Sequence, residues 1–221
     1  MLLLAFDTAT PAVTVALHDG SGVLAQETTV DARRHGELLA SSIASVLAAA
    51  GATREDLTGV AVGTGPGPYT GLRVGLVTAQ VLGSALGIPA HGVCTLDVIA
   101  SDAALAGPGR EFVVATDARR RELYWARYDA DALRLSGPAV NAPADIASQI
   151  GTGIPVAGTG ALLHAGLLAE PIAPEYPAAG TLARLGVQWL AAGNPALPPE
   201  PIYLRRPDAR VPGVPKRVSV P

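Results

Sequence analysis

The stretch that most constrains the fold of this chain is residues 60–87, VAVGTGPGPYTGLRVGLVTAQVLGSALG. Residues 60–64 are short and apolar, which predicts a buried strand; residues 65–70 form a glycine–proline loop, and residues 71–87 are predicted to be helical. A strand that leads through a glycine-rich turn into a helix can form an anion or ligand site, because free backbone N–H groups and the helix dipole favour negative charge there. The alternative is a tight connection whose glycines only allow close packing. Both interpretations stay open at this point.

The chain opens on an apolar run, residues 2–7, which predicts a buried strand ending in Asp7. Two further strands are predicted at 13–18 and 23–30, since DGSG between them is a strong hairpin signal. This Asp-Thr turn and meander resemble the opening of the actin/hexokinase/Hsp70 superfamily, which implies a turn that contacts a nucleotide phosphate. Ala9 stands where that turn usually has glycine, and Asp7 can equally cap the turn. The possible ligand or nucleotide residues are Asp7, Thr8, Gly65, Gly67 and Thr70.

The composition favours a folded protein with a substantial core. With 221 residues, 49% hydrophobic and 16% charged, the chain suits one large domain or two compact lobes. The single Cys94 excludes an internal disulfide and a cysteine-only metal cluster. No basic leader precedes the first strand and polar residues interrupt the most apolar helix, so we expect a cytoplasmic protein without membrane contact.

The charge is distributed unevenly along the chain. A net charge of −3 argues against a stand-alone nucleic-acid binder. Residues 201–221, however, hold five basic residues and one acid. This basic tail is either a solvated end or a contact to a phosphate or a partner.

A breaker cluster, AGPG at 106–109, divides the chain into two similar halves. A strand–strand–strand–helix–strand–helix order precedes the cluster, and a similar order follows it. We therefore predict two duplicated α/β lobes, residues 1–106 and 107–221, with a C-terminal tail that can cross back to the first lobe. The other predicted strands are 89–93, 111–117, 122–129, one from 133 and 154–157, and the predicted helices are 35–50, 71–87, 96–105, 143–150 and 178–192.

Two predicted helices carry stripes of small residues. A glycine inside a helix costs about 1 kcal/mol relative to alanine, so a stripe of them needs a compensating gain. The compensation expected here is the close approach of another helix, from this chain or from a partner. The stripes are Ala40, Ala44 and Ala48 in one helix, and Gly71, Gly75, Ala79, Gly83 and Gly87 in the other.

Several blocks together closely resemble the bacterial TsaB (YeaZ) family of tRNA threonylcarbamoyladenosine biosynthesis proteins. They are LLAFDTATPAVTVAL, VGTGPGPYTGLRVG, HGVCTLDVIA, ATDARRRELYWARY and EPIYLR, in that order along essentially the whole chain. The resemblance implies a duplicated actin-like (ASKHA or RNase H-like) fold, each lobe a mixed sheet with helices. It also implies kinship with the paralogue TsaD. That subunit works with the ATPase TsaE to form threonylcarbamoyladenosine next to the anticodon of ANN-decoding tRNAs.

The same resemblance bears on catalysis. It implies that TsaD holds a metal with a His-x-x-x-His pair on a helix, at positions that here are Thr95 and Ile99. A hydroxyl and an alkyl group cannot replace two imidazoles, and no two of the four histidines are three or four residues apart. We expect Thr95 to cap its helix instead. We therefore expect no catalytic residue, no metal and no cofactor on this chain alone, with ATP or ADP and the metal on partner subunits.

The leading hypothesis is a non-catalytic scaffold or activator of the TsaB–TsaD–TsaE complex, an accessory subunit of a tRNA threonylcarbamoyltransferase. It would form a heterodimer with TsaD through the two predicted helices that carry the small-residue stripes, 35–50 and 71–87. It would also bind TsaE and would contact tRNA only through the complex. In isolation the same surface can form a homodimer. The predicted interface residues are Leu39, Ile43, Gly71, Arg73, Gly75, Ala79 and Gly83.

Two other functions remain open. The first is an ATP-dependent phosphotransferase or ATPase, with a nucleotide between the lobes, near Asp7 and the loop at 158–160. The second is direct tRNA binding through the basic tail. Arg119, Arg120 and Arg121 are either a solvated turn or a contact to tRNA or a partner.

Overall fold

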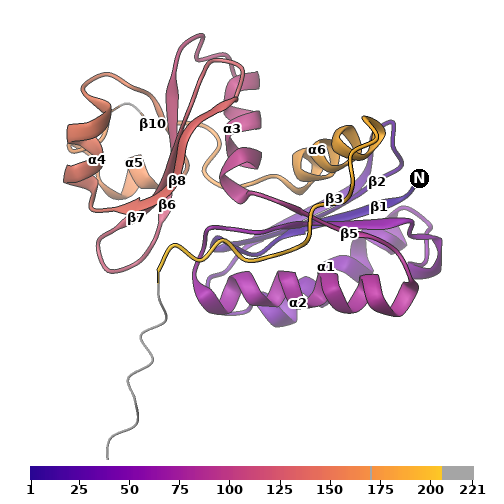
Figure 1. Ribbon diagram of the computed structural model, residues 1–221. Helices are drawn as coiled ribbons and strands as arrows, with labels where there is room; N and C mark the ends of the chain where they lie inside the picture. Colours follow the sequence, from indigo (N-terminus) through magenta and orange to yellow (C-terminus); the bar gives the residue numbers. More distant parts are fainter. Residues whose placement is uncertain (170, 206–221) are drawn as a thin grey trace, which may run out of the picture.

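The computed structural model describes residues 1–169 and 171–205, and within them two lobes stand side by side, each built on a five-stranded sheet (Figure 1). The first lobe contains β1 (Leu3–Asp7), β2 (Ala12–His18), β3 (Val23–Val30), α1 (His35–Ala49), the short η1 (Arg54–Asp56), β4 (Gly59–Gly63), α2 (Tyr69–Leu86) and β5 (Ala90–Val93). The second sheet and the remaining helices comprise α3 (Thr95–Leu105), β6 (Phe112–Asp117), β7 (Leu123–Tyr128), β8 (Arg134–Asn141), α4 (Pro143–Ile150), β9 (Val156–Ala157), α5 (Gly160–Leu163), β10 (Pro171–Ile172) and α6 (Ala179–Ala191).

The two sheets have the same topology. The first has the order β3-β2-β1-β4-β5, and the second, β10-β9-β6-β7-β8, is the same order written from the other edge. In each sheet the first three strands form an antiparallel meander, and the last two are parallel to the first. The predicted fold, two duplicated lobes with mixed sheets, is confirmed.

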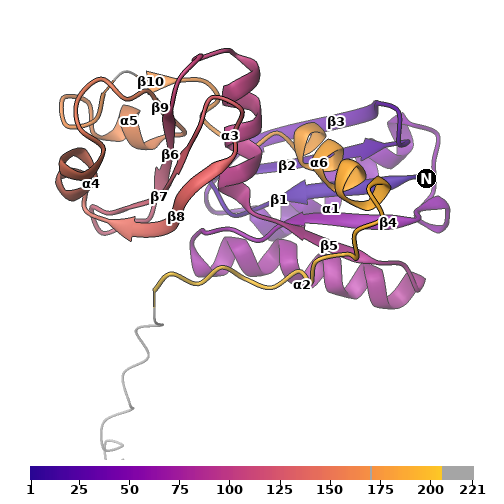
Figure 2. The same ribbon diagram turned by 45° about the horizontal axis from the view of Figure 1, so that its top comes forward.

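Helices cover both faces of the first sheet, as Figures 1 and 2 show. α1 and α2 lie on one face and α6 on the other. Alternate residues of β1 serve the two faces, as the period of a strand requires. Leu4 and Phe6 belong to the core under α1 and α2, whereas Leu3 and Ala5 pack with Leu182 of α6.

The helices around the second sheet show that the chain crosses between lobes. α3 precedes the breaker cluster in sequence but packs on the second sheet, where Ile99 shares a core with Phe112 and Tyr128. α6 follows that sheet in sequence but returns to the first one. The position 106/107 therefore separates the two sheets, but not the helices that cover them. α3 and α6 also contact each other, and the Arg184 guanidinium donates a hydrogen bond to Ser101 Oγ (2.7 Å).

The described C-terminal segment, residues 194–205, runs back along the first lobe (Figure 2). The N–H of Gly92 donates to the Leu197 carbonyl (2.8 Å), and the N–H of Ile202 donates to the Thr64 carbonyl (2.9 Å). Arg205 then reaches the second lobe, where its guanidinium donates to the Ala118 carbonyl (2.9 Å). The rest of the predicted basic tail, residues 206–221, lies outside the described residues.

Most predicted elements are confirmed, two of them, β3 and α4, with the predicted bounds. The short elements η1, α5 and β10 are absent from the prediction, because segments of two to four residues show no period. None of the helices in the described part of the chain has the length and apolar character needed to cross a membrane.

Candidate functional site

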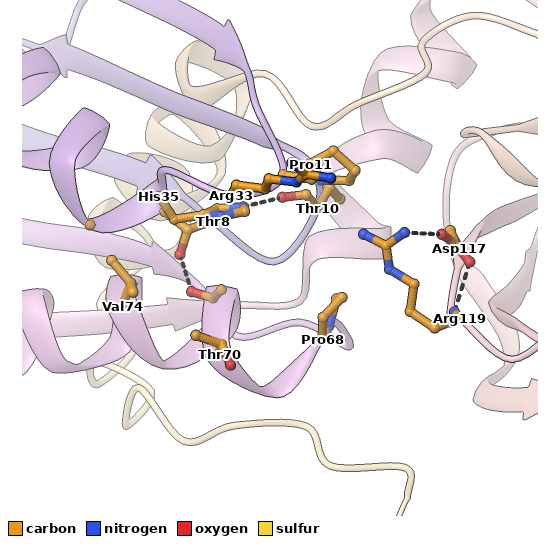
Figure 3. A pocket seen from close by; sticks show the side chains of 13 residues that line it. Thr8, Thr10, Pro11, Arg33, His35, Pro68, Thr70, Val74, Asp117 and Arg119 are labelled. Atoms are coloured by element: carbon orange, nitrogen blue, oxygen red, sulfur yellow. Dashed lines mark hydrogen bonds and ion pairs between the residues drawn. The ribbon is translucent and has the colours of Figure 1, made fainter.

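A cavity of about 160 Å³ lies where the two lobes meet (Figure 3). Thr8 and Thr10 of the β1–β2 turn and the first residues of α1 and α2 line it from the first lobe, and Asp117 and Arg119 line it from the second. Of the predicted ligand residues, Thr8 and Thr70 lie in this wall, whereas Asp7 does not.

The Asp7 carboxylate is fully buried and bonded within the protein. Its Oδ1 accepts a hydrogen bond from the Ala9 N–H (2.7 Å), and its Oδ2 accepts one from the Thr95 hydroxyl (2.6 Å). Burial raises the pKa of Asp7, against the opposing effect of these two bonds and of His35. Asp7 therefore caps its own turn, the second of the two roles that the sequence allowed.

Thr95 does not cap α3, so that prediction is wrong. Thr95 is the first residue of the helix, and Cys94 occupies the N-cap position. The Thr95 hydroxyl donates to Asp7 and accepts a hydrogen bond from the Gly65 N–H (3.1 Å). It thus joins the end of β1, the glycine–proline loop and α3, and the Gly65 N–H is engaged in an internal hydrogen bond.

Thr8 explains the glycines of α2. Its hydroxyl donates to the Gly71 carbonyl (2.7 Å) and accepts from the Gly75 N–H (3.0 Å). These are the two groups that would bond directly in an uninterrupted α-helix, so a side chain of the β1–β2 turn is inserted into the helix ladder. A Cβ atom on Gly75 would lie 2.6 Å from Thr8 Oγ1, and one on Gly67 would overlap the Ala9 carbonyl.

Most of the small-residue stripe of α2 therefore meets the β1–β2 turn and the chain's own sheet, not another helix as expected; only Gly71, at its start, also faces a helix residue, His35 of α1. Gly83, farther along, faces the Ile88 carbonyl and Ala90, and Ala79 is fully buried. Among the predicted interface residues Arg73 is exposed and Ile43 is half-buried. The other five, Leu39, Gly71, Gly75, Ala79 and Gly83, are buried and do not reach the surface of this structure.

The surface of these two helices is formed by other residues. We call Ala40, Ala44 and Ala48 of α1 with Val77 and Val81 of α2 the outer face, because all five are exposed. Val77 is 48% and Val81 59% exposed. No charged residue occurs at 38–49 or 74–86, so this face is apolar and nearly free of charge.

The β6–β7 turn presents the second lobe to the cavity. Arg119, Arg120 and Arg121 have φ of 60°, 55° and 61°, a left-handed conformation that costs a non-glycine residue about 1 kcal/mol. The Asp117 Oδ1 accepts the Arg119 N–H (2.7 Å), and the Ala118 N–H donates to the Glu122 carbonyl (3.0 Å). Arg205 holds the turn from outside, through the Ala118 carbonyl and an ion pair with Glu122.

A larger cavity, of about 370 Å³, adjoins the first and shares Pro68 and Arg119 with it. Tyr69, Tyr124 and Tyr203 contribute to its wall. The rings of Tyr69 and Tyr203 stack with centroids 5.5 Å apart, and the Arg73 guanidinium lies 5.1 Å from the Tyr69 centroid. The wall also includes Gly67 of the predicted ligand loop.

Other candidate groups have structural roles. Within residues 1–169 and 171–205 no three His, Cys, Asp or Glu side chains could jointly hold a metal. Burial raises the pKa of the Cys94 thiol to about 12, so it stays protonated. Gly158 and Gly160, which the nucleotide-binding alternative would use, pack against Ala115 of β6, and a Cβ atom on Gly160 would lie 2.6 Å from the Ala115 Cβ.

Among the cavity-wall residues that sequence reasoning missed, three are exposed and basic or aromatic: Arg33, Tyr69 and Tyr203. Each precedes or begins a predicted element, or lies near the end of the chain, where exposed polar and aromatic residues are common. No local period links them. A basic pair before a helix and a tyrosine after a loop proline were the available signals, and both are weak.

The comparisons with known proteins agree on one family. The family described as TsaD: tRNA N6-adenosine threonylcarbamoyltransferase matches residues 22–179. An uncharacterized protein of Mycobacterium tuberculosis is 49% identical over 213 residues, which cover 94% of this chain and 93% of that protein. The tRNA threonylcarbamoyladenosine biosynthesis protein TsaB of Escherichia coli is 35% identical over 131 residues, 59% of this chain and 56% of that protein. In the solved structures, YeaZ from Pseudomonas aeruginosa superposes with a TM-score of 0.79 at 28% identity, over 92% of this chain and 99% of that one.

Proposed function

The chain belongs to the TsaD family of tRNA N6-adenosine threonylcarbamoyltransferase proteins, with TsaB and YeaZ among its relatives, and we propose that it is a non-catalytic subunit of this pathway. The relatives named TsaB support involvement of this chain in tRNA threonylcarbamoyladenosine biosynthesis. The finer proposal is a cytoplasmic scaffold that binds a TsaD-type paralogue, with a TsaE-type ATPase as the third member.

The observation that carries the scaffold proposal is the outer face of α1 and α2. Stable interfaces have cores that are depleted of charge, and monomers rarely leave large apolar surfaces uncovered. Two adjacent helices here expose the alanines and valines of the outer face together with uncharged serine and glutamine side chains, and their charged residues, Glu37 and Arg73, lie only near their starts. Small side chains at Ala40, Ala44 and Ala48 allow a second pair of helices to approach closely.

The buried residues where the two lobes meet support a non-catalytic role. Thr95 and Ile99, both fully buried, stand where the resemblance places the metal-binding histidines of TsaD. The Asp7 carboxylate and the Thr8 hydroxyl are bonded to Thr95 and to α2. In this proposal ATP or ADP and the metal belong to the partner subunits.

Arginine substitutions on the outer face test the proposal. Val77→Arg and Ala44→Arg place a charge on exposed positions, so the fold should persist, while co-elution with the cognate TsaD-type subunit on gel filtration should be lost. Leu24→Arg is the matched control, because Leu24 on β3 is also 48% exposed but lies outside the outer face. Co-elution of the two outer-face variants at the wild-type level would refute the interface.

Omission experiments test the role itself. A tRNA modification assay with this chain, the TsaD-type subunit and the TsaE-type ATPase, each left out in turn, should lose product whenever this chain is absent. Full modification without it would refute the scaffold proposal. For the chain alone, light scattering should show a dimer that Val77→Arg converts to a monomer, since a face built for a paralogue can pair with its own copy.

A further inference from the structure

The geometry of the lobe junction points to an RNA contact on this chain itself. We infer that Arg33, Tyr69, Arg73, Arg119 and Tyr203, here called the arginine–tyrosine surface, bind the phosphates and an unpaired base of a single RNA strand. The inference deepens the proposed function and rests on it, because that function supplies an RNA substrate.

The charge of this surface is the reverse of the charge of the chain. The chain carries a net −3, yet among the described residues Asp117 is the sole acidic one in the walls of the two cavities. Within the described residues, neither Arg33 nor Arg73 has a carboxylate within ion-pair distance. Arg119 pairs with Asp117 (3.3 Å) but keeps 58% of its side chain exposed. Positive charge that the protein leaves uncompensated suits a phosphate backbone.

The shape of the surface suits an extended ligand. The cavities of about 160 and 370 Å³ adjoin at Pro68 and Arg119, so the arginines are distributed along them. Arg33 lies at the end beside α1, where Figure 3 shows it next to Pro11, and Arg119 lies across from it on the second lobe. Because Arg33 and Arg119 come from different lobes, successive phosphates of a strand can contact both.

The tyrosines supply a stacking platform at the other end. Arg73, Tyr69 and Tyr203 form one stack: the guanidinium lies over the Tyr69 ring, and its Nη1 donates to the Tyr69 hydroxyl (2.6 Å). Tyr203 ends the stack and is 45% exposed. Sequence-tolerant binding of single strands combines such an aromatic face with a positive groove.

The backbone of the β6–β7 turn is consistent with a binding role. Three successive left-handed arginines are unfavourable, and such strain persists where surrounding contacts impose it and often where function needs it. Here Asp117 and Arg205 impose it, by bonds to the Arg119 N–H and to the Ala118 carbonyl. The result is that Arg119 belongs to the walls of both cavities.

The test is a binding titration of the full chain with a short fluorescein-labelled single-stranded RNA. Binding should be visible by fluorescence anisotropy at low salt. The double variant Arg33→Gln/Arg119→Gln should weaken it at least tenfold and lower the slope of log affinity against log salt by about 1.4, two phosphate contacts of a single strand. Tyr203→Ala should weaken it about tenfold.

Arg54→Gln is the control for the loss of an exposed positive charge outside the arginine–tyrosine surface, because the Arg54 side chain lies on η1 and is 71% exposed; its effect is compared with half of the effect of the double variant. Circular dichroism should show that all variants are folded. An absence of RNA binding by the wild-type chain, or an equal loss with Arg54→Gln, would overturn the inference. Displacement of the RNA by free AMP at similar concentrations would also overturn it, in favour of a mononucleotide site.

The outcome is separable from the proposed function. If the variants of the arginine–tyrosine surface still co-elute with the TsaD-type subunit, the scaffold role stands whether or not the wild-type chain binds RNA. If the chain binds RNA but the modification assay does not need it, the RNA contact stands and the scaffold role falls.

Discussion

The turns after β1 and after β6 are equivalent by topology and begin alike. In the first, the Ala9 N–H donates to Asp7 Oδ1 (2.7 Å); in the second, the Arg119 N–H donates to Asp117 Oδ1 (2.7 Å). An aspartate that ends a strand and bonds the N–H two residues on is a local motif, formed by the residue type itself.

The two turns differ in what covers them. Asp7 is fully buried beneath the glycine–proline loop and α2, an 18-residue helix, whereas the equivalent helix of the second lobe, α5, has 4 residues. The Asp117 side chain is 26% exposed, beside three arginines. The same motif is thus a structural element in one lobe and part of an accessible surface in the other. Burial, and not the motif, decides which.

The largest expected effect comes from forcing the first turn open. A Cβ atom on Gly63 would overlap the Asp7 carboxylate, so Gly63→Ala should lower the free energy of unfolding by about 3 kcal/mol or more, measured by urea denaturation. Gly36→Ala is the control: nothing lies within 4 Å of its Cβ position in α1, and it should stabilise by about 1 kcal/mol. Equal effects of the two variants would contradict the tight packing of the first turn.

The next effect compares the two aspartates directly. Asp7→Ala leaves the buried Thr95 hydroxyl and Ala9 N–H without their acceptor and should cost about 2–3 kcal/mol. Asp117→Ala leaves an N–H that water can reach and should cost about 1 kcal/mol or less. Denaturation curves measured side by side decide this; similar costs would mean that burial does not separate the two turns.

The pH dependence sharpens the comparison further. Burial raises the pKa of Asp7 in the folded chain above its ordinary value of 3.8, so folding favours the protonated form. This contribution to stability is complete below the unfolded pKa and is lost as the pH rises through the folded pKa. Asp7→Asn should therefore show a smaller decrease in stability than the wild type between acid and neutral pH. Parallel stability curves would rule out this effect.

The smallest effect concerns strain in the second turn. Arg121 has φ of 61°, and glycine adopts that conformation without penalty, so Arg121→Gly should raise the free energy of unfolding by about 0.5 kcal/mol. The measurement is a thermal or urea unfolding curve. A clear destabilisation would show that the Arg121 side chain contributes more than its backbone costs.

Sequence patterns predicted the architecture well, for a physical reason. Alternation at 13–18 and the glycine breakers at 106–109 report local backbone preference and burial, and both act over a few residues. The repetition of strand order then predicted the duplication, which the two identical sheet topologies confirm. The identity of the helix partners was not accessible in the same way, since α3 and α6 pack on the lobe that lies across the breaker cluster.

The candidate site shows the same limit more sharply. The pattern of Gly71, Gly75, Ala79 and Gly83 correctly indicated a close approach but not its partner, which is Thr8 and the chain's own sheet. A missing side chain leaves space on a helix, and the sequence says nothing of what fills it. Val77 and Val81, the exposed valines of the outer face, lie between those glycines in the sequence, and the small-residue pattern did not predict their exposure.

Residue identity and local order were enough to predict the family, the two-lobe α/β fold and the lack of a His-x-x-x-His pair. The folded chain was needed to show that Asp7 and Thr8 are engaged in internal hydrogen bonds. It was also needed to show that one junction brings together Arg33, Tyr69, Arg119 and Tyr203. Burial and proximity arise from contacts between segments far apart in the chain, which no local pattern reports.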